Sequence, residues 1–422
     1  MRAIALLLHR YVGLVMAGFL LIAGLTGALL AWYEPLDAVF APAMHSLTPP
    51  SADAAPLDPL ALRERVLASH PEVQINFLAL QLAPGKPLRM NPQARPDAEG
   101  DEVAELANNQ WFIDPYSGDI VAKREWGDIS QGLKNLMPFV YRLHYTLALG
   151  TIGRYAFGII ALLWTLDCFI GAYLTFPPRR RRRVKATNTK TWWQRWQPAW
   201  RIRWRANPYK INFDLHRAGG LWPWAMLLVV AWSSVAFNLS EVYQPVMRTL
   251  LAHQAQGDDL PTLARPRTRP EIDFNGALRI GRQLMGQQAR LKGFKVDHEQ
   301  LLYYQADRGI YTYRVHSSLD VNEEYGSTQV LFDGNSGELL LSWLPSGAAS
   351  GDTLTNWIET LHMAAIWGWP LRVFMSLLGI AVAMLSVTGV VIWWRKRAAR
   401  LLQEAGRTNG DSPVGTPVTS AG

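Results

Sequence analysis

Four strongly apolar stretches alternate with long polar blocks along the chain. They lie at Ala3–Trp32, Tyr155–Phe176, Leu221–Leu239 and Val373–Trp394. The first holds about 20 consecutive apolar residues, which is enough for a helix to cross a hydrocarbon core of roughly 30 Å. A secretion signal is the rival interpretation of this first stretch. Its length, and the sequence Trp32-Tyr33-Glu34-Pro35 that follows it, favour an uncleaved spanning helix.

The two long polar blocks carry patterns typical of small α+β units. In the first block (residues 33–138), helical spacing at Ala61–His70 precedes alternating stretches at Val73–Leu82 and Asn109–Ile113. In the second block (residues 240–355), a helical stretch precedes three alternating ones: Gly276–Leu291, then Leu301–Tyr304, Gly309–Val315 and Ser327–Phe332. Asp-x-x-Ser-Gly-acid occurs in both blocks, starting at Asp114 and Asp333, and predicts a hairpin turn.

Histidines recur at the ends of the apolar stretches with matching neighbours. Leu-His-Arg-x-x-Gly-Leu around His9 returns 207 positions later around His216. His144 is followed at +6, +10 and +27 by Gly, Arg and Gly, and His362 repeats these spacings 218 positions later. The economical explanation is duplication. The predicted fold is therefore an integral membrane protein with four transmembrane α-helices in two duplicated halves, each with an external α+β domain.

This interpretation divides the whole chain into segments of alternating character. The predicted segments are transmembrane helix 1 (3–32), external domain 1 (33–138), an interfacial segment with transmembrane helix 2 (139–176), a basic Trp-rich cytoplasmic loop (177–212), transmembrane helix 3 (213–239), external domain 2 (240–355), an interfacial segment with transmembrane helix 4 (356–396) and a disordered cytoplasmic tail (397–422).

Charge sets the expected orientation of these segments. Residues 177–210 contain 12 Lys or Arg and no Asp or Glu, and Arg395-Lys396-Arg397 follows the last apolar stretch. The positive-inside rule predicts that both are cytoplasmic, with both termini inside and both polar blocks outside. The net charge of +8 is then a topology feature, and no nucleic-acid partner is expected, because the run Arg179–Arg183 abuts a spanning helix.

The predicted orientation pairs the four histidines as metal ligands. His9 and His216 begin outward-running helices, and His144 and His362 precede inward-running ones. The feasible pairs are therefore His9 with His216 and His144 with His362, each able to clamp a planar metal cofactor. The chain has one cysteine and no Cys-x-x-Cys-His, so a haem would be held non-covalently, as b-type. Two histidines on one iron suit electron transfer and disfavour oxygen chemistry.

Five ionisable residues are further candidates. Arg154 and Arg372 follow His144 and His362 and are expected either to bind haem propionates or to reach lipid headgroups. Arg10 and Arg217 carry the same two alternatives, and the positive-inside role is favoured. Asp167 lies inside an apolar stretch and is either a proton or quinol site or a carboxylate hydrogen-bonded to a neighbouring Ser or Thr.

A Trp-rich segment of the basic loop predicts contact with membrane lipid. Five tryptophans are interleaved there with Arg and Gln, as in a helix that lies on an anionic surface: Trp192, Trp193, Trp196, Trp200 and Trp204. Docking of an electron donor is the less favoured alternative for this segment.

Taken together, these motifs resemble the PepSY-associated transmembrane family over roughly residues 5–400. The resemblance extends to the FoxB-type ferric-siderophore reductases, which carry b-type haems. It implies two b-type haems in a bacterial inner-membrane protein, PepSY-like periplasmic domains, a ferric siderophore as electron acceptor, and a quinol or a cytoplasmic reductase as donor. Two alternatives stay open: a general cytochrome b carrier, and a non-enzymatic sensor or peptidase regulator whose haem is structural or absent.

Overall fold

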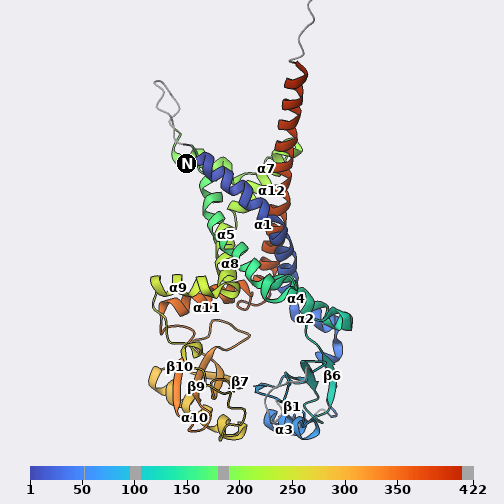
Figure 1. Ribbon diagram of the computed structural model, residues 1–422, viewed down its shortest axis with the longest axis vertical. Helices are drawn as coiled ribbons and strands as arrows, with labels where there is room; N and C mark the ends of the chain where they lie inside the picture. The colour runs from blue at the N-terminus through green and yellow to red at the C-terminus, as the bar shows by residue number, and fades with distance from the viewer. Residues whose placement is uncertain (52, 96–105, 179–189, 411–422) are drawn as a thin grey trace, which may run out of the picture. The chain divides into compact units, whose positions relative to one another are not determined.

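The computed structural model describes residues 1–51, 53–95, 106–178 and 190–410 (Figure 1). The predicted basic run Arg179–Arg183 lies outside the described residues, as does the end of the predicted tail, 411–422.

Within the described residues, three helices are long and apolar enough to cross a membrane. They are α1 (Arg2–Leu30), α5 (Gly150–Thr175) and the Trp369–Glu404 part of α12 (Trp369–Gly410). The disorder expected from residue 397 onward is wrong for 397–410, because α12 continues through them. Ala, Arg, Leu, Gln and Glu, all good helix formers, fill residues 398–405 and favour this extension.

The predicted transmembrane helix 3 (213–239) is divided between two helices. α7 (Pro208–Leu221) and α8 (Trp224–Asn238) meet at an angle of 68°. Pro223 lies in the break, where its missing N–H and fixed φ interrupt the helical ladder. The part of the chain that the structure describes therefore has three candidate spans, or four if the bent pair counts as one. The boundary expected at residue 213 is also revised, because α7 begins at Pro208, capped by Asn207.

Two compact units divide the structure. Unit 1 comprises Met1–Leu25, Ile160–Ala231 and Leu378–Gly422, and unit 2 comprises Thr26–Ile159 and Trp232–Leu377. The helices α1, α5, α8 and α12 each contribute residues to both units. Unit 1 is helical in its described part, and it also contains α6 (Trp192–Trp196) and the 3₁₀ turn η4 (Gln197–Trp200).

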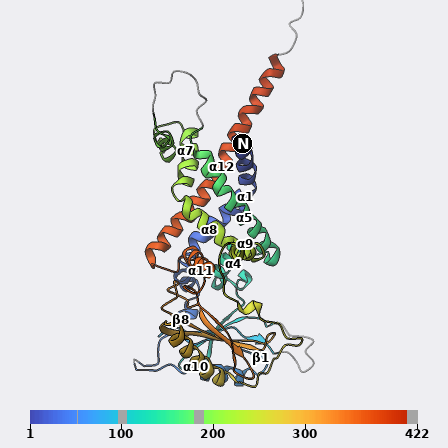
Figure 2. The same cartoon turned by 90° about the vertical axis from the view of Figure 1, so that its left-hand side faces the viewer.

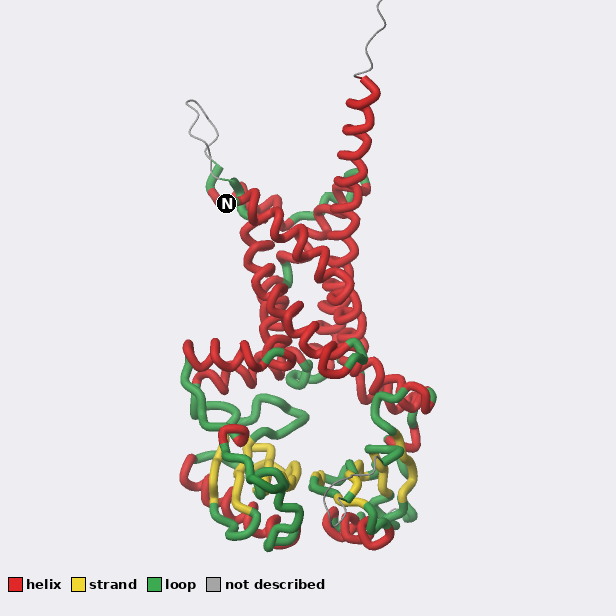
Figure 3. Tube along the Cα trace, viewed as in Figure 1, coloured by secondary structure: helices red, strands yellow, loops and turns green. Residues whose placement is uncertain are grey.

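Unit 2 holds all the described strands together with short helices (Figure 3). Its further helices and turns are α2 (Tyr33–Phe40), η1 (Pro42–Met44), α3 (Pro59–Ser69), η2 (Ile129–Gln131), η3 (Leu133–Asn135), α4 (Leu136–Thr146), α9 (Ser240–Leu250), η5 (Gly257–Asp259), α10 (Phe274–Lys292) and α11 (Ser350–His362). Its strands are β1 (Val73–Gln74), β2 (Phe77–Ala79), β3 (Leu88–Met90), β4 (Gln93–Ala94), β5 (Gln110–Ile113), β6 (Ile120–Arg124), β7 (Val296–Gln305), β8 (Ile310–Ser317), β9 (Thr328–Asp333) and β10 (Leu339–Trp343).

The strands of the two polar blocks share one sheet. The largest sheet has the order β10-β9-β8-β7-β2, so a strand of the first block extends the sheet of the second. β2 pairs antiparallel with β7, with Phe77 opposite Tyr303. The remaining strands of the first block form a small sheet β3-β5-β6 and the pair β1-β4. α10 packs against β7, β8 and β9 (Figure 2).

One hydrophobic core joins the two polar blocks. Side chains from both lie in it, among them Leu62, Ile75 and Leu78 from the first block and Phe274, Tyr311 and Phe332 from the second. The expectation that each block packs as a domain of its own is revised, because a common core and a common sheet leave no independent boundary between them. Their helices and hairpins do match the sequence prediction.

Both predicted hairpin turns are confirmed. β5 and β6 are joined by the turn that begins at Asp114, whose Oδ1 accepts from the Tyr116 amide at 2.8 Å. β9 and β10 are joined by the turn at Asp333, whose Oδ1 accepts from the Asn335 amide at 2.8 Å. The glycine of each turn has positive φ, +81° at Gly118 and +74° at Gly337, a conformation that favours a residue without Cβ.

Candidate functional site

In unit 1, the structure brings the imidazoles of His9 on α1 and His216 on α7 together. Their ring centres lie 6.0 Å apart, with the planes inclined by 55°. Two imidazoles that bind the same iron at roughly 2 Å each place their ring centres about 6 Å apart. The spacing of this pair therefore fits axial ligation of one metal centre.

The outer nitrogens of these two rings have different partners. His9 Nδ1 lies 2.9 Å from each carboxylate oxygen of Asp167, which is 7% exposed on α5. His216 Nδ1 lies 3.1 Å from the carbonyl oxygen of Leu385 and 3.1 Å from Thr388 Oγ1, both on α12. Because Nδ1 is engaged in both rings, Nε2 is the nitrogen that would bind a metal. Neither of the two roles predicted for Asp167 included a contact with His9.

Both rings line a pocket of about 490 Å³. This volume is within the range of roughly 300–1,000 Å³ usual for small-molecule and cofactor sites. Most of the lining is apolar, and four basic side chains also line it: Arg2, Arg10, Arg217 and Lys396. The pocket thus combines apolar walls for a macrocycle with cations that could meet carboxylates.

In unit 2, His144 and His362 form a second pair. Their ring centres are 6.3 Å apart and their planes stand at 89°. Each lies on a short helix, since His144 is in the last turn of α4 and His362 ends α11. Burial, and next the nearby His144 ring, lower the pKa of His362 to about 3. His362 is therefore neutral at pH 7, the form in which histidine binds a metal.

Hydroxyl groups meet the outer nitrogens of the second pair. Thr26 Oγ1 lies 3.0 Å from His144 Nδ1, and Ser233 Oγ lies 2.7 Å from His362 Nδ1. Sequence reasoning missed both residues. The repeat could have found them, because Thr26 and Ser233 are separated by the same 207 positions that separate His9 from His216.

Three histidine rings lie against a glycine of another helix. A Cβ on Gly27 would lie 3.1 Å from His144 Cε1, and one on Gly389 would lie 3.1 Å from His216 Cε1. Gly171 is less crowded, with 3.6 Å from its Cβ position to His9 Cε1. The small residues of the repeat thus leave room for the rings of the histidines.

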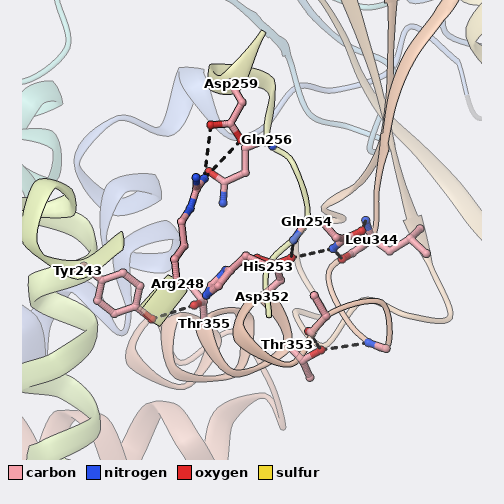
Figure 4. A network of polar contacts seen from close by, with 12 residues as sticks. Tyr243, Arg248, His253, Gln254, Gln256, Asp259, Leu344, Asp352, Thr353 and Thr355 are labelled. Atoms are coloured by element: carbon pink, nitrogen blue, oxygen red, sulfur yellow. Dashed lines mark hydrogen bonds and ion pairs between the residues drawn. The ribbon is translucent and has the colours of Figure 1, made fainter. Parts of the chain in front are cut away.

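A buried polar network holds the start of α11, the helix that carries His362 (Figure 4). Asp352 accepts from His253 Nδ1 at 2.7 Å and from the Gln254 amide at 2.8 Å. The side chains of His253 and Asp352 are 5% and 2% exposed. The backbone of Gly351 approaches the His253 ring so closely that a Cβ there would overlap it. Together with Tyr243 Oη, 2.8 Å from Thr355 Oγ1, this network ties α11 to the end of α9.

Three of the four predicted arginines pair with a carboxylate of the protein, and the fourth lines a pocket. Arg217 pairs with Asp214 at 2.8 Å, and Arg154 pairs with Glu241 at 3.6 Å. Arg372 pairs with Glu324, and Arg10 lines the pocket of unit 1. Propionate binding by these arginines stays a prediction.

The Trp-rich segment folds around an aromatic cluster. The rings of Trp192, Trp193 and Trp200 each lie 5.0–5.2 Å from that of Trp196. Trp196 Nε1 donates to Thr175 Oγ1 at the end of α5. α6 spans five residues, too short for the extended amphipathic helix expected here, while its exposed Trp192 and Trp193 remain suited to lipid.

Unit 2 also contains a polar pocket of about 590 Å³. Its lining is Glu34, Pro35, Ala38, His45, Gln81, Lys86, Glu324, Tyr325 and Arg372. The sequence neighbours of Glu34 and His144, Tyr33 and Tyr145, both have ring contacts with Tyr141, at 6.1 and 5.5 Å between ring centres. Sequence reasoning missed this pocket, because its residues come from four separate segments.

Within the described residues, no group of three or more His, Cys, Asp and Glu side chains is arranged to hold a metal ion. The family model of the PepSY-associated TM region matches residues 6–396, nearly the whole chain. The chain belongs to that family. This PepSY-associated protein has no match among curated proteins.

Proposed function

We propose that this PepSY-associated protein is a b-type dihaem protein of a bacterial inner membrane that moves electrons across it and reduces ferric siderophores. Four spans in two duplicated halves, cytoplasmic termini and periplasmic polar blocks belong to the same proposal. The observation that carries it is the presence of two imidazole pairs with ring centres 6.0 and 6.3 Å apart. Bound haem would supply reversible one-electron exchange between Fe(II) and Fe(III).

The chain's own residues have definable tasks in this function. The histidines hold the two centres, and their Nδ1 partners orient the rings. The apolar lining of the unit 1 pocket excludes water from the cofactor, and Arg10 and Arg217 are positioned there to meet propionates. Duplication is supported by a side-chain contact that occurs in both halves: Thr26 meets His144, and Ser233 meets His362. Ser233 lies 207 positions after Thr26, and His362 lies 218 positions after His144.

The polar pocket of unit 2 is the proposed position of the ferric siderophore. It presents both acidic and basic side chains, and Tyr33, which adjoins its Glu34, begins the ring contacts toward His144. One electron from a quinol or a cytoplasmic reductase converts the chelated Fe(III) to Fe(II). Fe(II) is a poorer Lewis acid and is bound more weakly by hard oxygen ligands, so the iron is released.

An optical spectrum of the purified protein tests the cofactor part of the proposal. We expect a reduced-minus-oxidised b-type spectrum with two haems per chain, and a colourless preparation would overturn it.

The acceptor is tested next by adding a panel of ferric siderophores to dithionite-reduced protein freed of excess reductant. Reoxidation of the haem together with Fe(II) trapped by a chelator supports direct reduction. Failure of every siderophore would leave the general cytochrome b carrier as the better assignment.

A further inference from the structure

Asp167 places a carboxylate against the outer nitrogen of one of the four paired histidines, His9. Both its oxygens lie 2.9 Å from His9 Nδ1. The other three rings meet neutral oxygens: Thr388 and a backbone carbonyl at His216, Thr26 at His144 and Ser233 at His362. In the repeat, the counterpart of Asp167 is Leu385, so this contact breaks the symmetry of the two halves.

Burial makes the contact strong. The Asp167 side chain is 9% exposed and that of His9 is 28% exposed, so water competes little for this hydrogen bond. A hydrogen bond to an ionised group is roughly twice as strong as one between neutral groups. A carboxylate that accepts from Nδ1–H makes the imidazole a more basic, more electron-rich ligand, which favours Fe(III) over Fe(II).

We propose that Asp167, through His9, lowers the reduction potential of the haem held by His9 and His216 below that of the haem held by His144 and His362. This inference rests on the proposed function, in which electrons enter on the side of the first pair and leave on the side of the second. A lower potential at the first pair makes this direction the favourable one. Asp167 is thus a positioning residue that acts through His9, which replaces the quinol-site interpretation as its main role.

Potentiometric titration of the purified full chain, followed by its haem spectrum, tests the proposal. Single substitutions of His9 and His362 by Ala first assign the two potentials to the two pairs. We expect D167N to raise the potential of the His9/His216 component and to leave the other component unchanged. D167E, which restores the carboxylate, should return the potential toward its original value. The matched control T388V removes a neutral partner of His216 and should produce a smaller shift.

A second variant tests the same idea if D167N fails to fold or loses its haem. Thr26 Oγ1 lies 3.0 Å from His144 Nδ1, so T26D offers a carboxylate of similar size to the second pair. We expect T26D to lower the potential of the His144/His362 component. The inference is overturned if D167N leaves both potentials in place, or if T26D binds haem and shifts nothing. Absence of haem from the unsubstituted protein would instead overturn the proposed function.

Discussion

The two histidine pairs have nearly the same ring spacing but different surroundings. In unit 1 the rings come from α1 and α7, line an apolar pocket with four basic side chains, and include one ring held by a carboxylate. In unit 2 the rings lie at the ends of two short helices and meet hydroxyl groups, and this unit also contains a polar pocket. Equal spacing with unequal surroundings suits two centres of one cofactor type that differ in potential and in access.

The largest effect should come from removing single ligands. H216A should abolish the first haem and H362A the second, each halving the haem content while sparing the other centre. Pyridine haemochrome quantitation per chain measures this outcome. Retention of both haems in every single His variant would contradict the pairing.

Loosening α11 should affect the second pair alone. D352N removes the carboxylate that His253 Nδ1 and the Gln254 amide contact, and leaving a buried polar group without its partner costs about 1–3 kcal/mol. We expect a lower thermal stability and preferential haem loss from the His144/His362 centre. The His9/His216 centre is the internal reference, and equal loss from both centres would show that Asp352 supports overall stability only.

Replacing a glycine by alanine should weaken haem binding where the histidine ring is close, at Gly389 and Gly27, and should affect it little at Gly171. G389A places Cβ 3.1 Å from the His216 ring, and G27A places it 3.1 Å from the His144 ring, whereas G171A leaves 3.6 Å to His9. Overpacking typically costs about 1–3 kcal/mol. G389A and G27A should each weaken haem binding at one centre, while the matched G171A variant should bind haem nearly normally. Titration of the three haem-free proteins with haem measures the difference.

The smallest effect should follow the loss of a neutral hydrogen-bond partner. T26V keeps the shape of Thr26 and removes the hydroxyl beside His144, a change of about 0.5–1.5 kcal/mol. Haem dissociation from the second centre, followed by transfer to apomyoglobin, should accelerate a few fold. The first centre is the internal reference in the same sample, and acceleration there would argue against a local effect of Thr26.

Side-chain periodicity and turn chemistry could be predicted from the sequence because they depend on residues that are close together along the chain. α3 and α10 follow from the spacing of apolar residues, and the two Asp-x-x-Ser-Gly hairpins follow from the needs of a tight turn. The break at Pro223 was overlooked although its cause is local, because the apolar run continues across it. The helix through residues 397–410 was not predicted, because the charged residues there resemble those of a solvated tail.

Pairing of equivalent histidines could be predicted because a repeat returns the same residue at the same place in the fold. The partners of their outer nitrogens could not, since Asp167 lies 158 positions from His9 and Ser233 lies 129 from His362. The joining of β2 to β7 is equally non-local. Composition and period thus established the apolar helices, the hairpins and the ligand candidates. Which carboxylate or hydroxyl meets each ring depended on how the helices pack, because hydrogen bonds between distant segments form at the positions that packing brings together.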